Sequence, residues 1–209
     1  MKLTITISIS ILLIISLIGC GNKQATKTIE NLKLAYNSAA TNSEKFLKYS
    51  EIAKEEGFIK IANLFSATSK SDAIHAFNYK KSLEKLGIEV GDAEIGNFEV
   101  KSTNENIIES INIKALESNS TYPKYIKTSE FEKAKDATKA FKWARDSGLN
   151  FKETFKKVLI DFRKNNGNLV NSKYYICPTC GNIYEDGNLT DACDLCSTSA
   201  ERYIIFEVK

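Results

Sequence analysis

Four cysteines near the C-terminus carry the clearest chemistry in this 209-residue sequence. Cys177 and Cys180 form one CxxC knuckle, and Cys193 and Cys196 form a second. Each knuckle places two sulfurs on the same side of a tight turn, so two facing knuckles complete a tetrahedron of ligands. Tetrahedral sulfur ligation suits iron or zinc. Gly181, directly after the first knuckle, permits the sharp backbone turn that this arrangement needs.

Three interpretations of the four cysteines are open at this point. They could hold one redox-active iron, which is the favoured interpretation, or one zinc ion in a purely structural ribbon. They could also form two disulfides, which an exported location would favour. A bound metal ion or disulfides are expected to stabilise the cysteine-containing segment, because residues 172–209 are too few to build a sufficient hydrophobic core alone.

The stretch from Tyr175 to Gly181, YICPTCG, followed by Tyr184 and the second knuckle, resembles rubredoxin domains. The resemblance implies an iron centre that cycles between ferric and ferrous states. Asp194 and Ser197 depart from the pattern, since such families usually carry Pro and Gly there, and the charge of Asp194 is expected to lower the reduction potential. A small aromatic shell is available to shield the centre, formed by Tyr174, Tyr175, Tyr184, Tyr203 and Phe206.

Long helices must position the rest of the chain. Apolar residues at three- and four-residue spacing predict four of them, at residues 28–56, 58–86, 104–122 and 129–162. Gly57 and Gly87 suit helix C-termini, Pro123 is expected to close the third helix, and residues 88–103 are expected to form a long connection with some strand character. The predicted fold is mainly α: a ferritin-like four-helix bundle over residues 28–165, a polar linker, and a small rubredoxin-like β module over residues 172–209.

The bundle resembles the rubrerythrin family in residues 49–65, in the Asp72-Ala-Ile-His75 motif and in Tyr122-Pro123. Together with the four-cysteine module, the resemblance covers almost all of residues 28–209 in the same domain order. It implies a carboxylate-bridged di-iron site in the bundle that reduces peroxide, with electrons supplied through the rubredoxin-like iron. It also implies a homodimer and a redox partner protein.

The ligand positions implied by this resemblance are mostly altered. Glu-x-x-His of the second helix becomes Asp72-x-x-His75, and Glu-x-x-Glu of the third becomes Lys114-x-x-Glu117. The remaining ligand positions fall on residues without donor atoms: Ala39 in the first helix, and Gly148 and Phe151 in the fourth. A di-iron pair needs about four carboxylates, so the sequence argues against a di-iron centre.

The surviving trio of Asp72, His75 and Glu117 has two interpretations. The three side chains could bind one metal ion weakly, as two carboxylates and an imidazole do elsewhere. Alternatively, Lys114 could form buried ion pairs with both carboxylates, with His75 hydrogen-bonded beside them. The ion-paired core is favoured, because the Lys114 ammonium would repel a metal cation.

The N-terminal sequence predicts an export signal. Lys2 is followed by an apolar run, and the segment Leu17-Ile18-Gly19-Cys20 resembles a bacterial lipobox, in which Cys20 would be lipidated. An ordinary signal peptide or an uncleaved anchor is the alternative. The expectation is a signal peptide at residues 1–19, a tether at residues 20–27, and an exported bacterial lipoprotein held on a membrane and facing the periplasm or cell exterior.

The charge balance of the chain argues against nucleic-acid binding. With 29 basic and 26 acidic side chains, the chain lacks the basic excess that nucleic-acid binding requires. The leading expectation is one-electron transfer at a single four-cysteine iron. A structural or binding protein with a zinc ribbon is the first alternative, and a peroxide-reducing enzyme of oxidative stress defence is the second.

Overall fold

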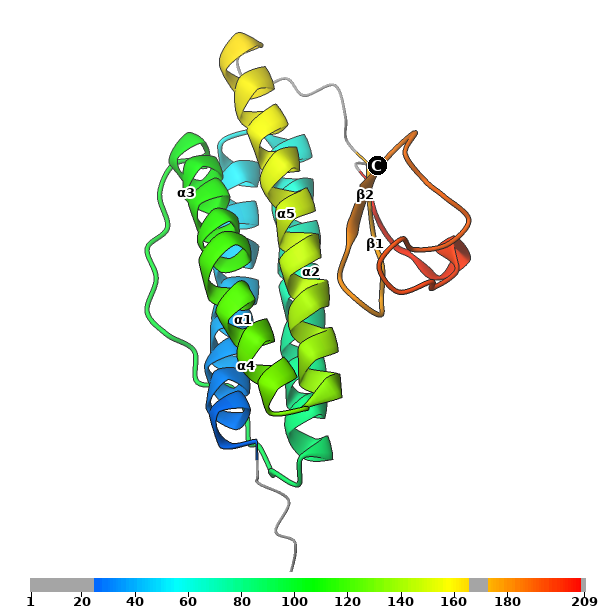
Figure 1. The fold of residues 1–209 in the computed structure, drawn as a ribbon. Helices are drawn as coiled ribbons and strands as arrows, with labels where there is room; N and C mark the ends of the chain where they lie inside the picture. The colour runs from blue at the N-terminus through cyan, green and yellow to red at the C-terminus, as the bar shows by residue number, and fades with distance from the viewer. Residues whose placement is uncertain (1–24, 166–172, 208–209) are drawn as a thin grey trace, which may run out of the picture.

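A computed structural model describes residues 25–165 and 173–207 as a helical bundle with a small sheet packed against its side (Figure 1). This confirms the predicted fold class. The predicted signal peptide and the lipidation site Cys20 lie outside the described residues, as do most of the predicted tether and linker. None of the described helices combines the length and apolar character needed to cross a membrane.

The first two helices form a hairpin. Helix α1 (Thr26–Glu55) is joined to α2 (Ile59–Lys85) by a tight turn at Gly57, whose φ of +84° favours glycine. A long connection then leads to α3 (Thr103–Leu116). The predicted strand character of this connection is wrong, because its backbone binds side chains of α1; the Gly96 N–H, for example, donates to Thr41 Oγ1 over 2.9 Å.

The third predicted helix, at residues 104–122, is not a single α-helix in the structure. Helix α3 passes into a π-helical turn, η1 (Glu117–Thr121), and then into α4 (Tyr122–Phe131). Pro123 therefore lies in the first turn of α4, where proline is tolerated, and does not close a helix. The predicted start of the fourth helix near residue 129 is also wrong. Lys133 takes a φ of +58°, which ends α4 and separates it from α5 (Lys135–Lys164).

The bundle core consists of two apolar clusters separated by a polar layer. One cluster contains Phe46, Phe65 and Phe155, and the other contains Tyr79 and Phe141. Helices α1, α2 and α5 each contribute to both clusters. Buried polar residues of these helices, together with one residue of α3 and one of η1, lie between the two clusters. This buried layer comprises Asn42, Asp72, His75, Lys114, Glu117 and Ser147.

The C-terminal module is built on three short antiparallel strands in the order β2-β1-β3. They are β1 (Tyr174–Ile176), β2 (Ile183–Glu185) and β3 (Ile204–Phe206), with a 3₁₀ turn, η2 (Ala200–Arg202), before the last. These strands form the sheet of the small β module that the sequence predicted. Ile176 and Ile183 are buried in the first bundle cluster, so the module and the bundle share one core.

Candidate metal centre and buried polar network

The two cysteine knuckles have the same backbone geometry. The Gly181 N–H donates to the Cys177 carbonyl over 2.9 Å, and the Ser197 N–H donates to the Cys193 carbonyl over 2.7 Å. Gly181 has a φ of +77° and Ser197 a φ of +59°. Ser197 thus adopts the left-handed conformation that glycine adopts more readily, so this departure from the rubredoxin pattern leaves the turn intact.

The structure brings the four predicted ligands together. The sulfurs of Cys177, Cys180, Cys193 and Cys196 all lie within 4.8 Å of one another. Two pairs, Cys177 with Cys196 and Cys180 with Cys193, are 3.4 Å apart, whereas a disulfide bond measures about 2.05 Å. All four are therefore free thiols. Bonds of about 2.3 Å to a central ion would separate tetrahedral sulfurs by roughly 3.8 Å, so the cysteines fit a metal.

Contacts among these thiols shift their pKa values in opposite directions. A hydrogen bond with Cys180 lowers the pKa of Cys177 to about 4, while the same contact raises the pKa of Cys180 well above its ordinary value. Burial raises the pKa of Cys196. Four adjacent thiolates would repel one another without a cation between them, so the arrangement favours a bound metal ion.

Three of the five aromatic residues predicted to shield the centre, Tyr175, Tyr184 and Tyr203, pack with the cysteines. The other two, Tyr174 and Phe206, pack with the bundle core instead. Tyr184 and Tyr203 are stacked with ring centroids 5.1 Å apart. The Tyr184 hydroxyl also accepts the backbone N–H of Asp194 over 2.9 Å. Trp143 of α5 donates its indole N–H to the carbonyl of Leu195 in the second knuckle over 3.1 Å. The bundle therefore helps to position this knuckle.

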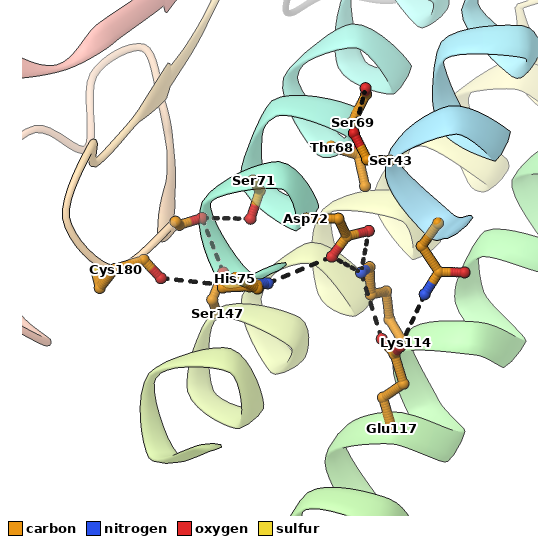
Figure 2. A network of polar contacts seen from close by, with 12 residues as sticks. Ser43, Thr68, Ser69, Ser71, Asp72, His75, Lys114, Glu117, Ser147 and Cys180 are labelled. Carbon is orange, nitrogen blue, oxygen red and sulfur yellow. Dashed lines mark hydrogen bonds and ion pairs between the residues drawn. The ribbon is translucent and has the colours of Figure 1, made fainter. Parts of the chain in front are cut away.

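The predicted trio in the bundle is assembled around a lysine (Figure 2). Lys114 Nζ donates to the two carboxylate oxygens of Asp72 over 2.7 and 2.8 Å and lies 3.4 Å from Glu117 Oε2. The Lys114 side chain is only 2% exposed, and its ammonium sits 5.2 Å from the Phe46 ring centre and 6.0 Å from that of Phe151. The geometry is that of the ion-paired core.

The two carboxyl groups respond differently to this environment. Burial alone would raise the pKa of Asp72, but the charges and hydrogen bonds of Lys114 and His75 outweigh it and lower that pKa. Burial raises the pKa of Glu117, and the nearby charge of Asp72 raises it further. The Lys114 charge lowers this pKa, but its contact with Glu117 is longer than its contacts with Asp72 and does not outweigh the burial. The Lys114 ammonium thus interacts more closely with Asp72 than with Glu117.

His75 connects this network to the metal-binding knuckle. Its Nδ1 lies 3.3 Å from Asp72 Oδ1, and its Nε2 lies 3.1 Å from the carbonyl oxygen of Cys180. Ser71 of α2 and Ser147 of α5 both donate to the next carbonyl, that of Gly181, over 2.7 and 2.9 Å. The contact of His75 with Asp72 fits the predicted ion-paired core. The contacts with the carbonyls of Cys180 and Gly181 were not predicted, because sequence periodicity gives no register between two separate modules.

Of the three positions predicted to lack ligands, Ala39 and Phe151 are buried with apolar side chains. A Cβ at Gly148 would collide with the hydroxyl of Ser118 in η1, so a larger residue there requires that hydroxyl to move. The sequence analysis missed Asn42, whose Nδ2 donates to Glu117 Oε1 over 2.8 Å. Its signal was present, because it lies three residues after Ala39 on the same helix face.

A ferritin-like bundle followed by a four-cysteine β module defines a class of two-part metalloprotein. Within that class, the profile of the Rubrerythrin family matches residues 30–159. The chain belongs to the rubrerythrin family. It is 28% identical to rubrerythrin-2 of Clostridium acetobutylicum over 86% of this chain and 96% of that protein. It is 24% identical to nigerythrin of Nitratidesulfovibrio vulgaris over 81% of each chain. A solved nigerythrin structure superposes with a TM-score of 0.79 at 22% identity, covering 86% of both chains.

The predicted location as an exported, membrane-anchored lipoprotein is contradicted by this kinship. The chain matches nearly the full length of rubrerythrin-2 and most of nigerythrin, and a relationship of this extent to the rubrerythrins conflicts with an exported lipoprotein. The prediction rested on the apolar run and the lipobox-like motif of the N-terminal segment alone. An apolar run before a cysteine satisfies a compositional pattern without determining where a protein is delivered.

Proposed function

We propose that the protein carries single electrons through one iron ion held by Cys177, Cys180, Cys193 and Cys196, and that its bundle holds no di-iron centre. The observation that carries the proposal is the buried Lys114 ammonium between Asp72 and Glu117. An iron ion bound by the four thiolates would supply a reversible ferric–ferrous couple. A nigerythrin structure described as fully reduced and all ferrous supports iron in this class of protein.

Charge balance explains why Lys114 closes the bundle site. A carboxylate-bridged iron pair draws on about four carboxylates, whereas the polar layer described above offers Asp72 and Glu117. Those two groups already surround one cation at hydrogen-bonding distance. A metal ion would have to displace the ammonium from a buried position, and the expelled charge would then lack a partner.

The bundle has a supporting role in this proposal. His75, Ser71 and Ser147 bind the backbone of the first knuckle, and Trp143 binds the second. A platform that fixes the metal ligands reduces the rearrangement accompanying a change of charge at the metal. A separate redox partner protein and pairing of two copies of the chain complete the proposal.

The test is metal content per chain, measured after growth with iron and zinc both supplied, together with the visible spectrum. One iron per chain and ferric–thiolate absorbance are expected. One zinc per chain without colour would instead make the protein a structural zinc ribbon. About three irons per chain, with peroxide turnover that is lost in Asp72→Asn or Glu117→Gln, would establish the peroxide-reducing alternative.

A further inference from the structure

A pair of threonine hydroxyls bridges the two cysteine knuckles. Thr198 Oγ1 lies 3.1 Å from Cys196 Sγ and 2.8 Å from Thr179 Oγ1. Thr179 stands between the two cysteines of the first knuckle, and Thr198 is the second residue after the last cysteine. Thr198 is buried, whereas Cys196 is the one partly exposed cysteine of the four. The contact therefore lies at the solvent-facing sulfur.

The backbone fixes both hydroxyls in place. The Thr198 carbonyl accepts the Cys193 N–H over 2.8 Å, and the Thr179 carbonyl accepts the side-chain amide of Asn78 in α2 over 2.9 Å. In the first knuckle, the residue equivalent to Thr198 is Asn182, whose side chain accepts a hydrogen bond from Asn150 over 2.8 Å. The hydroxyl–sulfur contact is thus particular to the second knuckle.

The direction of these hydrogen bonds depends on the state of the sulfur. With Cys196 as a thiol, Thr198 donates to Thr179 and the sulfur can donate to Thr198. A metal-bound thiolate has no proton, so it can only accept. Thr198 then has to turn its single hydrogen toward the sulfur, and Thr179 has to donate to the Thr198 oxygen.

We propose that Thr198 is a positioning residue that donates a hydrogen bond to the Cys196 thiolate, is supported by Thr179, and raises the reduction potential of the bound iron. The inference rests on the proposed iron centre. Hydrogen bonds to cluster sulfurs tune such potentials, and a donor stabilises the more negatively charged ferrous centre more than the ferric one. The effect opposes that expected from the charge of Asp194.

The test compares midpoint potentials of iron-loaded variants at equal iron content per chain. In Thr198→Val, which keeps the shape and removes the donor, the ferric–ferrous equilibrium should move about tenfold toward ferric iron, or roughly 59 mV for one electron. Thr198→Ser should restore it, and Thr179→Val should shift it in the same direction by less. Thr190→Val is the control, since that hydroxyl binds the Ala192 carbonyl over 2.7 Å and should leave the potential unchanged.

A second readout separates this inference from the proposed function. Cobalt(II) bound by the cysteines gives sulfur-to-metal charge-transfer bands. Losing a donor to sulfur should move one of these bands to lower energy in Thr198→Val and leave it unchanged in Thr190→Val. Unchanged bands and unchanged potentials would overturn the role of Thr198. If the native protein holds only zinc, electron transfer fails as the function, while the cobalt bands still decide whether Thr198 binds the thiolate.

Discussion

His75 Nε2 lies 3.1 Å from the carbonyl oxygen of Cys180, so a side chain of the bundle binds the backbone of the metal-binding knuckle directly. The other ring nitrogen of His75 faces Asp72, which is paired with Lys114. A continuous series of polar contacts therefore runs from the buried ammonium to the cysteines (Figure 2). The two halves of the chain are expected to respond to each other's substitutions.

Replacing Gly181 with alanine tests how closely the knuckle must approach α2. A Cβ at this position would lie 2.6 Å from His75 Nε2 and 2.9 Å from Ser71 Oγ. Overpacking of this kind costs about 1–3 kcal/mol. Gly187→Ala is a matched control, because Gly187 has a similar φ of +85° with no atom within 4 Å of the added Cβ. Denaturant unfolding of the metal-loaded proteins should show the larger loss in Gly181→Ala; equal losses would mean that backbone strain alone acts.

The sequence specified the cysteine centre well, because ligand spacing within a knuckle is a local property of the chain. It also identified Asp72, His75, Lys114 and Glu117, because these residues fall on the ligand positions that the resemblance to the rubrerythrin family implies. The ion pairs favoured from sequence match the contacts of Lys114 in the structure.

The interruptions of the helices and the contact between the two modules could not be predicted from the periodicity of the sequence. The π-helical turn at Glu117 and the left-handed conformation of Lys133 divided two predicted helices at unexpected places. The first is a change of helix type over five residues, and the second is the conformation of one residue. The contact of His75 with Cys180 joins residues 105 positions apart, and it required the docking of one module on the other.

Lys114→Met should destabilise the folded protein strongly at pH 7. The substitution leaves Asp72 and Glu117 buried without their cation, and breaking a buried pair by removing one partner costs about 3–5 kcal/mol. Lys33→Met, at an exposed position on α1, serves as the control and should change the unfolding free energy by less than about 0.5 kcal/mol. Chemical denaturation at pH 7 measures both. A loss below about 1 kcal/mol for Lys114→Met would show that the carboxylates take up protons or solvent instead.

The stability of the protein should depend on the ionisation of Glu117. Its pKa is raised in the folded state, mainly by burial. The folded state therefore favours the protonated carboxyl, a contribution that is complete below the unfolded pKa of about 4.3 and is lost as the pH rises through the folded pKa. Asp72, whose pKa is lowered, contributes the opposite dependence and loses its contribution as the pH falls through its folded pKa.

Glu117→Gln isolates the first of these effects. The amide oxygen can still accept from Asn42, and the side chain no longer titrates. The unfolding free energy of the variant should therefore rise relative to that of the unaltered protein between pH 4 and pH 8, while the acid-side loss due to Asp72 remains in both. Urea unfolding at intervals of half a pH unit would show the difference. Two parallel profiles would mean that Glu117 has the same pKa in the folded and unfolded chains.

Removal of the metal should unfold the β module before the bundle. Strands β1, β2 and β3 have three residues each, and a separate cluster of the module is built from cysteines and tyrosines. Binding of a structural four-ligand metal contributes about 10–16 kcal/mol to the folding of small domains. After chelation, amide hydrogen exchange should accelerate in residues 174–206 while amides near Phe65 stay protected.

The same exchange experiment on Cys196→Ser with metal present should give an intermediate result, because three thiolates remain to bind the ion. The competing force is the burial of Ile176 and Ile183 in the bundle core. If the strands keep their protection after chelation, that shared core holds the module without a metal. The cysteines would then be needed for chemistry and not for folding.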